Sequence, residues 1–310
     1  MESIDDLKSL RTFLSVTQHG SFVQAARHMH VVPSVVAKRI AQLEAALGAR
    51  LFERTTRKVQ VTPAGERLRA RASALLAGIE DLTHDVSTAG SSGGPQGHLR
   101  VMAPSTLTTL HLGEMFTRFL RQHEGITMEI VLGNRSTNPL EDGYDLIVSG
   151  RLASYEGVLQ HPLAPIHYVL CASPAYLRKA PELEHPSDLA RHPCLVFEPL
   201  GRTWVFQSSR GALNVDVHPR LLVDDNQTVL RSAVNGLGIA MLPRYIAREA
   251  LARGDLKPAL PAFAPQEAWF KAFIPRRKAR LPQVAALCDW LAAQMPAING
   301  TSARRRTAAA

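Results

Sequence analysis

One short stretch constrains the fold of this sequence more than any other feature, because it has almost no side chain to bury. Residues 89–95 read Ala-Gly-Ser-Ser-Gly-Gly-Pro and show neither a helical nor a strand period. A stretch of this composition behaves as a flexible hinge, which we place at 89–96. With 310 residues, the chain is long enough for a small module before the hinge and a larger body after it.

Basic residues are concentrated before the hinge. Residues 8–71 contain twelve Lys and Arg against three Glu, a surplus that equals the net charge of +9 of the whole chain. A local excess of this kind is typical of surfaces that contact phosphates, so the first part is predicted to bind a nucleic acid.

Other bulk properties narrow the class of protein. The three cysteines are odd in number and include no Cys-x-x-Cys pair, which argues against a disulfide framework and against a zinc site. Neither a leader-like segment nor an apolar run of about 18 residues is visible. We therefore expect a cytoplasmic protein with no membrane partner.

Capping residues and apolar spacing predict three helices in the first part, residues 5–63. The first helix stops at Gly20, the second begins after Ser21, and the third begins at Pro33 and ends at Gly48. Two short extended runs at 51–54 and 58–62 follow and predict a hairpin with a basic tip.

This order of elements is typical of a winged helix-turn-helix, whose third helix enters the major groove while the hairpin touches the DNA backbone. A small helical domain with solvated charges is the alternative. We expect Ser34, Lys38 and Gln42 to contact bases, and Arg54, Arg57 and Lys58 to hold phosphates. The full set of expected DNA-binding residues is Ser21, Pro33, Ser34, Val35, Ala37, Lys38, Arg39, Gln42, Arg54, Arg57 and Lys58.

A long helix is predicted at 64–88. Its apolar residues alternate spacings of four and three from Leu68 to Val86, which is the pattern of a coiled-coil seam. The seam predicts a dimer, and packing of the same stripe onto the chain's own body is the alternative.

Beyond the hinge, extended runs alternate with helices over 97–297, which predicts a mostly parallel sheet and an α/β body with two lobes. The tail, 298–310, has no apolar period and is predicted to be disordered.

Two regions resemble a known family. From Leu7 to Gly65, "GSFVQAA", "KRIAQLEAALGARLFERT" and "VTPAG" occur in the order and spacing of the LysR-type DNA-binding domain. The sequence departs from that family at Val32 and Ala37, where hydroxyl residues are usual. Past the hinge, "GHLRVMAPS", "YDLIVSGR" and "VLCASPAYL" resemble the family's effector-binding domain, which is similar to the type 2 periplasmic binding proteins.

This resemblance implies an N-terminal winged helix-turn-helix, a long linker helix and a C-terminal two-lobed α/β domain. The chain would cross between the lobes near 161–167 and 269–274. A cleft between the lobes would bind a small-molecule co-inducer at the carboxyl ends of strands. The residues expected there are Ser105, Thr106, Asn134, Arg135, Ser136, Ser149, Gly150 and Phe197. Free amides and Arg135 would suit a small carboxylate, although each serine equally suits a helix cap or a turn.

Two other motifs receive structural interpretations. Gly236-Leu237-Gly238 follows a helix and precedes a strand, the reverse of a dinucleotide fingerprint, so we expect a helix stop. Asp224-Asp225-Asn226 is expected to cap a helix and not to bind a metal. We expect no metal, no cofactor and no catalytic residue.

The predicted function is a transcription regulator whose action on DNA is modulated by a small molecule. Its expected partners are double-stranded DNA with a dyad-like operator, a second or further copies of the chain in a dimer or tetramer, and, as a further candidate, RNA polymerase. The alternatives from other classes are a cytoplasmic solute-binding protein and an enzyme on a two-lobed α/β scaffold.

Overall fold

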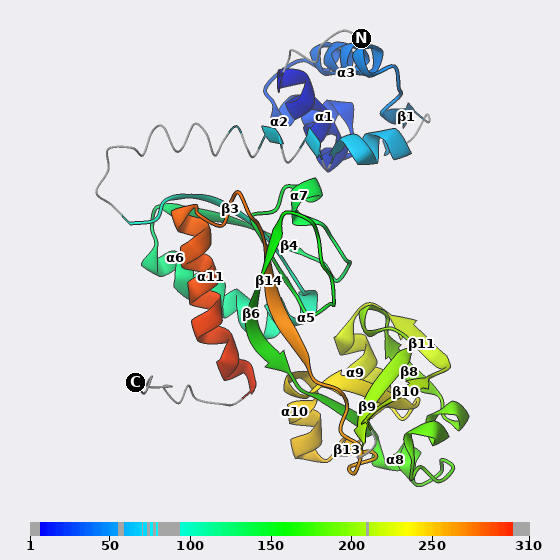
Figure 1. The fold of residues 1–310 in the computed structure, drawn as a ribbon. Helices are drawn as coiled ribbons and strands as arrows, with labels where there is room; N and C mark the ends of the chain where they lie inside the picture. The colour runs from blue at the N-terminus through cyan, green and yellow to red at the C-terminus, as the bar shows by residue number, and fades with distance from the viewer. Residues whose placement is uncertain are drawn as a thin grey trace.

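The computed structural model describes residues 7–54, 59–69, 71–72, 75–76, 79, 94–208 and 211–299. Figure 1 shows a small, mainly helical N-terminal domain, drawn in blue, and a larger body with two lobes. Among the described residues no helix is both long and apolar enough to cross a membrane.

The N-terminal domain has the predicted order of elements. These are α1 (Leu7–His19), α2 (Phe22–His28), α3 (Pro33–Leu47), β1 (Phe52–Arg54) and β2 (Val59–Val61), the two strands forming an antiparallel hairpin. Ser21 caps α2 by accepting a hydrogen bond from the amide of Gln24, and Gly48 ends α3 in the left-handed conformation, as predicted. Phe13, Val36 and Ile40 are fully buried in the core between the three helices. The winged helix-turn-helix is therefore confirmed.

A further helix begins after the wing. Its described helical residues are 63–69, 71–72, 75–76 and 79, and the hydroxyl of Thr62 caps it by accepting the amide of Gly65 at 3.0 Å. Gly65 is needed there because an added Cβ would lie 2.4 Å from the carbonyl oxygen of Leu51. The residues of the predicted coiled-coil stripe differ in burial. Ala72 is buried in the N-terminal core, whereas Leu75 is exposed. The start of the stripe thus packs on its own domain. The tip of the hairpin at 55–58, the rest of the predicted linker helix and most of the predicted hinge lie outside the described residues.

Each lobe of the body is built on a five-stranded sheet. The first lobe has the strand order β4-β3-β5-β14-β6 and the second has β11-β8-β12-β7-β13. The first lobe contains β3 (Gly97–Ala103), α5 (Ser105–Leu107), the π-helix η1 (Thr108–Leu112), α6 (Gly113–Gln122), β4 (Ile126–Leu132), α7 (Pro139–Asp142), β5 (Leu146–Ser149), β6 (Val158–Ile166), β14 (Ala268–Pro275), α11 (Pro282–Gln294) and η4 (Met295–Asn299). The second contains β7 (Tyr168–Ala172), α8 (Pro174–Leu177), η2 (Pro186–Arg191), β8 (Cys194–Phe197), η3 (Glu198–Leu200), β9 (Thr203–Ser208), β10 (Gly211–Asp216), β11 (Pro219–Val223), α9 (Asn226–Val234), β12 (Ile239–Pro243), α10 (Arg244–Arg253) and β13 (Lys257–Pro258).

Both sheets are mixed, which corrects the expectation of a mostly parallel sheet. In the first lobe β3 is parallel to β4 and β5, but β14 is antiparallel to β5 and β6. In the second lobe β7 is antiparallel to both β12 and β13. β3, β4 and β5 are joined through α6 and α7 and run parallel, whereas β7 and β14 enter their sheets directly from the other lobe and run antiparallel to their neighbours.

The chain passes between the lobes twice, at neighbouring points. The first passage is His167, the single residue between β6 and β7, and the second lies between β13 and β14. The range 269–274 is therefore not a passage; it lies within β14, which pairs with β6 along its whole length (Figure 1). The imidazole of His167 lies 3.3 Å from the carboxylate of Glu267, so the two passages also contact each other.

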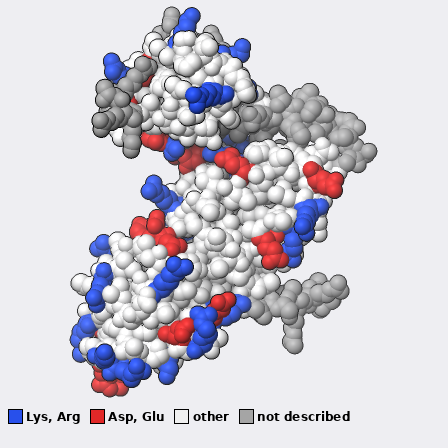
Figure 2. Space-filling view, turned by 180° about the vertical axis from the view of Figure 1, so that it is seen from behind, with Lys and Arg blue, Asp and Glu red and all other residues white. Residues whose placement is uncertain are grey.

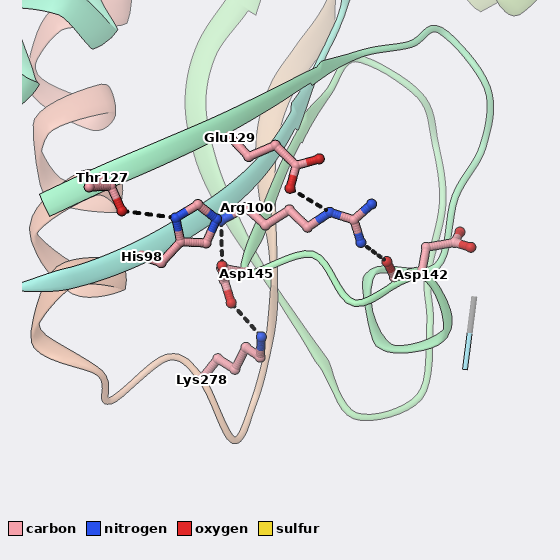
Figure 3. Close-up of polar contacts among 7 residues, drawn as sticks. All are labelled: His98, Arg100, Thr127, Glu129, Asp142, Asp145 and Lys278. Carbon is pink, nitrogen blue, oxygen red and sulfur yellow. Dashed lines mark hydrogen bonds and ion pairs between the residues drawn. The ribbon is translucent and has the colours of Figure 1, made fainter. Parts of the chain in front are cut away.

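A buried ion pair holds the turn between β14 and α11 against the first lobe. Lys278 pairs with Asp145, and both side chains are about 95% buried. The other carboxylate oxygen of Asp145 accepts the amide of Arg100 at 2.5 Å, while the guanidinium of Arg100 reaches Glu129 and the carbonyl of Asp142 (Figure 3). These contacts join segments more than 130 residues apart in sequence.

The C-terminal boundary differs slightly from the expected one. Ile298 and Asn299, assigned from sequence to the disordered tail, belong to η4: Ile298 is buried in the first-lobe core, and Asn299 donates to the carbonyl of Pro165. An apolar side chain that finds a core position keeps the chain ordered for two residues longer than predicted. The rest of the tail lies outside the described residues.

The three cysteines are buried and free. Burial raises the pKa of Cys171 and Cys194 to about 12 and that of Cys288 to about 11. Cys171 is a core residue, and a thiol of this pKa is not an active nucleophile near neutral pH.

Candidate functional site

The third helix presents one polar face away from the core. Ser34, Lys38 and Gln42 are exposed and recur every four residues, while Val36 and Ile40 face inward. Residues four apart lie on the same side of a helix. None of these three side chains makes a hydrogen bond or ion pair with another residue that the structure describes.

The start of α3 lacks a side-chain cap. Val32 occupies the N-cap position and provides no side-chain acceptor, and Pro33 follows at the first helical position. A missing cap typically costs about 0.5–2 kcal/mol of helix stability. Because Val32 replaces the hydroxyl residue usual in the family, α3 lacks this side-chain cap.

Other expected DNA-binding residues are engaged within the domain or only partly accessible. Ser21 caps α2, and a guanidinium nitrogen of Arg39 lies 3.4 Å from the hydroxyl of Thr12 on α1. Val35 and Ala37 are half-buried. Arg54 ends β1 but its side chain lies outside the description, as do Arg57 and Lys58.

An acidic residue connects the third helix to the wing. A carboxylate oxygen of Glu44 accepts the amides of Leu51 and Phe52 at 2.7 and 3.2 Å. This contact fixes the first strand of the wing relative to α3. Figure 2 shows Lys and Arg side chains on the outer surface of this domain.

A cavity lies between the two lobes of the body. It holds about 700 Å³ of empty space, a figure that includes the open solvent at its mouth. It is lined by Met102, Pro104, Thr106, Leu107, Gly133, Asn134, Arg135, Ile147, Val148, Ser149, Gly150, Arg151, Ile166, Tyr168, Phe197, Pro199, Leu200, Asn226, Pro243, Tyr245 and Phe270.

Six of the eight residues expected at the cleft line this cavity. They are Thr106, Asn134, Arg135, Ser149, Gly150 and Phe197. Ser105 and Ser136 do not. The hydroxyl of Ser136 lies 2.7 Å from that of Tyr155, and the amide of Ser105 donates to the side chain of Asn134.

Three lining residues of the first lobe also hold the lobes together. The side-chain amide of Asn134 donates to the carbonyl of Asp224 at 2.7 Å, and the hydroxyl of Thr106 donates to Asp225 at 3.2 Å. Arg151 of the first lobe lies 3.5 Å from Glu198 and 3.4 Å from the carbonyl of Pro199 in the second. The cavity is thus closed on these sides by polar contacts between the lobes.

The start of α9 has the expected cap. Asp225 is its N-cap and accepts both the amide and the hydroxyl of Thr228 at 2.8 Å. Burial opposes ionisation of Asp225, but these hydrogen bonds outweigh it and lower the pKa of the carboxyl below its usual value. Gly236 follows the helix with φ of 78°, so the helix stop is confirmed as well.

Electrostatically, the cavity lining is positive. Arg135 and Arg151 are its only charged members, and no Asp or Glu is among the lining residues. Burial raises the pKa of Tyr168 to about 12 and also raises the pKa of Tyr245, so both phenols stay neutral.

The aromatic part of the lining was not predicted from the sequence, apart from Phe197. Tyr168, Tyr245 and Phe270 supply three of its four aromatic rings, and Tyr245 lies edge-on to the ring of His111. Asn226 was considered only as part of a cap. These residues carry no local motif, and they come to the cavity from strands β7 and β14 and from helices α9 and α10, which are far apart in the sequence.

The comparisons with known proteins cover both parts of the chain. Residues 7–66 match the model for "bacterial regulatory helix-turn-helix protein, lysR family", and residues 92–296 match that for "LysR substrate binding domain".

Individual relatives align over nearly the whole length. An uncharacterized HTH-type transcriptional regulator, YhjC of Escherichia coli, is 30% identical over 94% of this chain and 98% of its own. The regulator PtxR of Pseudomonas aeruginosa is 28% identical over 92% of both chains. The full-length structure of the Vibrio cholerae virulence activator AphB superposes with a TM-score of 0.62 at 26% identity, covering 92% of this chain and 98% of that one. CrgA of Neisseria meningitidis, at 24% identity and a TM-score of 0.56, has the same fold over 94% of this chain and 98% of its own.

Proposed function

Because the chain belongs to the LysR family of bacterial transcriptional regulators, with a helix-turn-helix DNA-binding domain and a substrate-binding effector domain, we propose how it divides that work among its residues. The polar face of α3, formed by Ser34, Lys38 and Gln42, reads bases in the major groove. Arg54, Arg57 and Lys58 of the wing hold phosphates. The cavity between the lobes binds the effector that modulates DNA binding or activation.

The exposure pattern of α3 supports this assignment most directly. A helix whose one face is fully buried and whose other face carries uncommitted polar side chains can enter a groove without unfolding. Arg39 has a lesser role in this proposal, because its guanidinium already contacts Thr12.

The chain acts as a dimer in this proposal. Leu75 is exposed on the helix that follows the wing, in line with the predicted seam, and two-fold symmetry matches a dyad-like operator. Substitution of Leu75 by Glu is expected to weaken the dimer in light scattering, whereas Arg71→Glu on the same helix is expected to leave it intact.

We also propose that the protein works in the bacterial cytoplasm, where a DNA-bound regulator acts, and we assign it no enzymatic role. RNA polymerase is a proposed partner at promoters that the protein activates.

Selection of genomic DNA fragments with the purified full-length protein tests whether the polar face of α3 reads bases. We expect enrichment of a dyad-like fragment, and a loss of about 1–3 kcal/mol of binding free energy for Lys38→Ala or Gln42→Ala. Lys8→Ala and Gln18→Ala on α1 are matched controls and should bind within twofold of the unsubstituted protein. Failure to enrich any fragment at moderate salt, or equal binding by Lys38→Ala, would refute the assignment.

A further inference from the structure

Asn226 is a buried polar side chain without a partner. It is the first residue of α9, lines the cavity and is 93% buried, and its carbonyl oxygen Oδ1 has no hydrogen-bond donor among the described residues. Buried amide groups are nearly always hydrogen-bonded, since leaving one unsatisfied destabilises the folded state. An unsatisfied amide in the wall of a cavity therefore points to a group that enters from the cavity.

The neighbourhood of Asn226 restricts the charge of that group. The carboxylate of Asp225 already occupies the N-terminus of α9, where it is held by Thr228 and by Thr106. A second anion beside it would be repelled. The group that meets Asn226 is therefore not an anion, and because Oδ1 is an acceptor it is a hydrogen-bond donor, such as a hydroxyl or an amide N–H.

Positive charge lies elsewhere in the lining. Arg135 is exposed and forms no ion pair with a described residue, and Arg151 makes only long contacts with Glu198 and Pro199. Both follow strands of the first lobe, whereas Asn226 belongs to the second. A ligand anion would be stabilised by these guanidinium groups, and a cation would find no carboxylate among the lining residues.

Most of the remaining lining residues are apolar, and several carry aromatic rings. Tyr168, Phe197, Tyr245 and Phe270 contribute four aromatic faces or edges, and Tyr245 and Phe270 lie with ring centroids 6.2 Å apart. Such walls favour a flat, apolar body over an extended polar one.

We propose that the cavity binds a ring-bearing monocarboxylate, with its acid group on Arg135 and Arg151, its ring against the aromatic walls, and a neutral polar substituent hydrogen-bonded to Asn226. This inference rests on the proposed effector role of the cavity and narrows it to one ligand class. It makes Asn226 the residue that selects among ring acids.

Calorimetric titration of the full-length protein tests the class. The probes are phenylacetate, its three hydroxy derivatives, 2-naphthylacetate, and the matched neutral and cationic compounds phenylacetamide and phenethylamine. At least one ring acid should bind tenfold or more tightly than its amide, and the amine should not bind. Binding of the amine as tightly as the acid, or of no ring acid at all, would overturn the proposal.

Substitutions test the residues. Arg135→Gln should weaken acid binding at least tenfold, while Arg121→Gln on α6, an exposed arginine outside the cavity, should leave it unchanged. The best hydroxy derivative should lose its advantage over the parent acid in Asn226→Leu, which should also raise the urea midpoint of the free protein because an unsatisfied amide is removed. Retention of that advantage, or a lowered midpoint in both Asn226→Leu and Asn226→Ala, would assign Asn226 a structural role instead.

DNA binding is measured on the same preparations, which separates the two proposals. If the protein bound no DNA fragment specifically, the DNA-binding role proposed for α3 would be refuted, whereas the ligand titrations would keep their meaning. If the protein bound DNA specifically but did not prefer ring-bearing monocarboxylates, only the inference about the cavity would be refuted.

Discussion

The ion pair between Lys278 and Asp145 gives the sharpest stability prediction. Replacing Lys278 by Met keeps most of the side-chain volume but leaves the carboxylate of Asp145 buried with no cation. Both side chains are about 95% buried, so water cannot take over the role of the ammonium group. Removing one partner of such a pair typically costs about 3–5 kcal/mol, a large part of the stability of a domain, which is about 5–15 kcal/mol.

Urea unfolding followed by tryptophan fluorescence is the assay. All three tryptophans, Trp204, Trp269 and Trp290, lie in the effector-binding body, so the signal excludes the DNA-binding domain. With an unfolding slope of about 3 kcal/mol per molar urea, the expected loss shifts the midpoint down by about 1–1.7 M.

Two variants control the interpretation. Lys271→Met on β14 removes a lysine that bonds only to exposed Gln160, and it should cost less than about 1 kcal/mol. The double variant Lys278→Met with Asp145→Asn removes both charges, keeps an acceptor for the amide of Arg100, and should recover at least half of the loss. A single variant that loses less than about 1 kcal/mol, or a double variant no better than the single one, would refute the reasoning.

Four further predictions follow from local contacts. The three cysteine thiols, whose pKa values are raised by burial, should resist alkylation at neutral pH in the folded protein and react fully in urea; rapid labelling of the native state would contradict their placement. Glu44→Ala should cost about 1–3 kcal/mol in thermal unfolding of the DNA-binding domain and weaken operator binding, because two strand amides lose their acceptor. Gly238→Ala should destabilise the second lobe by at least about 1–3 kcal/mol, since its Cβ would lie 2.2 Å from the carbonyl oxygen of Pro193; an unchanged urea midpoint would be the contrary result. Asp225→Ala should cost about 0.5–2 kcal/mol at pH 7. Because the folded-state pKa of Asp225 is lowered, this cost should shrink as the pH falls below about 4 and the carboxyl is protonated, and a cost independent of pH would contradict the ionised cap.

Much of the fold was predictable because its signals are local. Ser21 and Gly48 mark helix ends through their own backbone and side-chain chemistry, and the apolar period of α3 identifies its buried face within fifteen residues. Strands such as Tyr168–Ala172 and Ile239–Pro243 are recognisable in the sequence because buried strands appear there as short apolar segments. The hairpin of β9 and β10 gave no comparable signal and was not predicted.

The contacts between segments far apart in the sequence became visible only in the folded structure. Composition, caps and periodicity act between near neighbours, so a basic helix-turn-helix domain followed by a two-lobed α/β body could be predicted from the sequence. The sequence could not determine that the side-chain amide of Asn134 donates to Asp224, that Lys278 neutralises Asp145, or that Asn226 lines the cavity with an Oδ1 unpaired among the described residues. These facts depend on contacts across as many as 133 residues of chain, where pairing of strands and packing of lobes, and no local pattern, choose the partner.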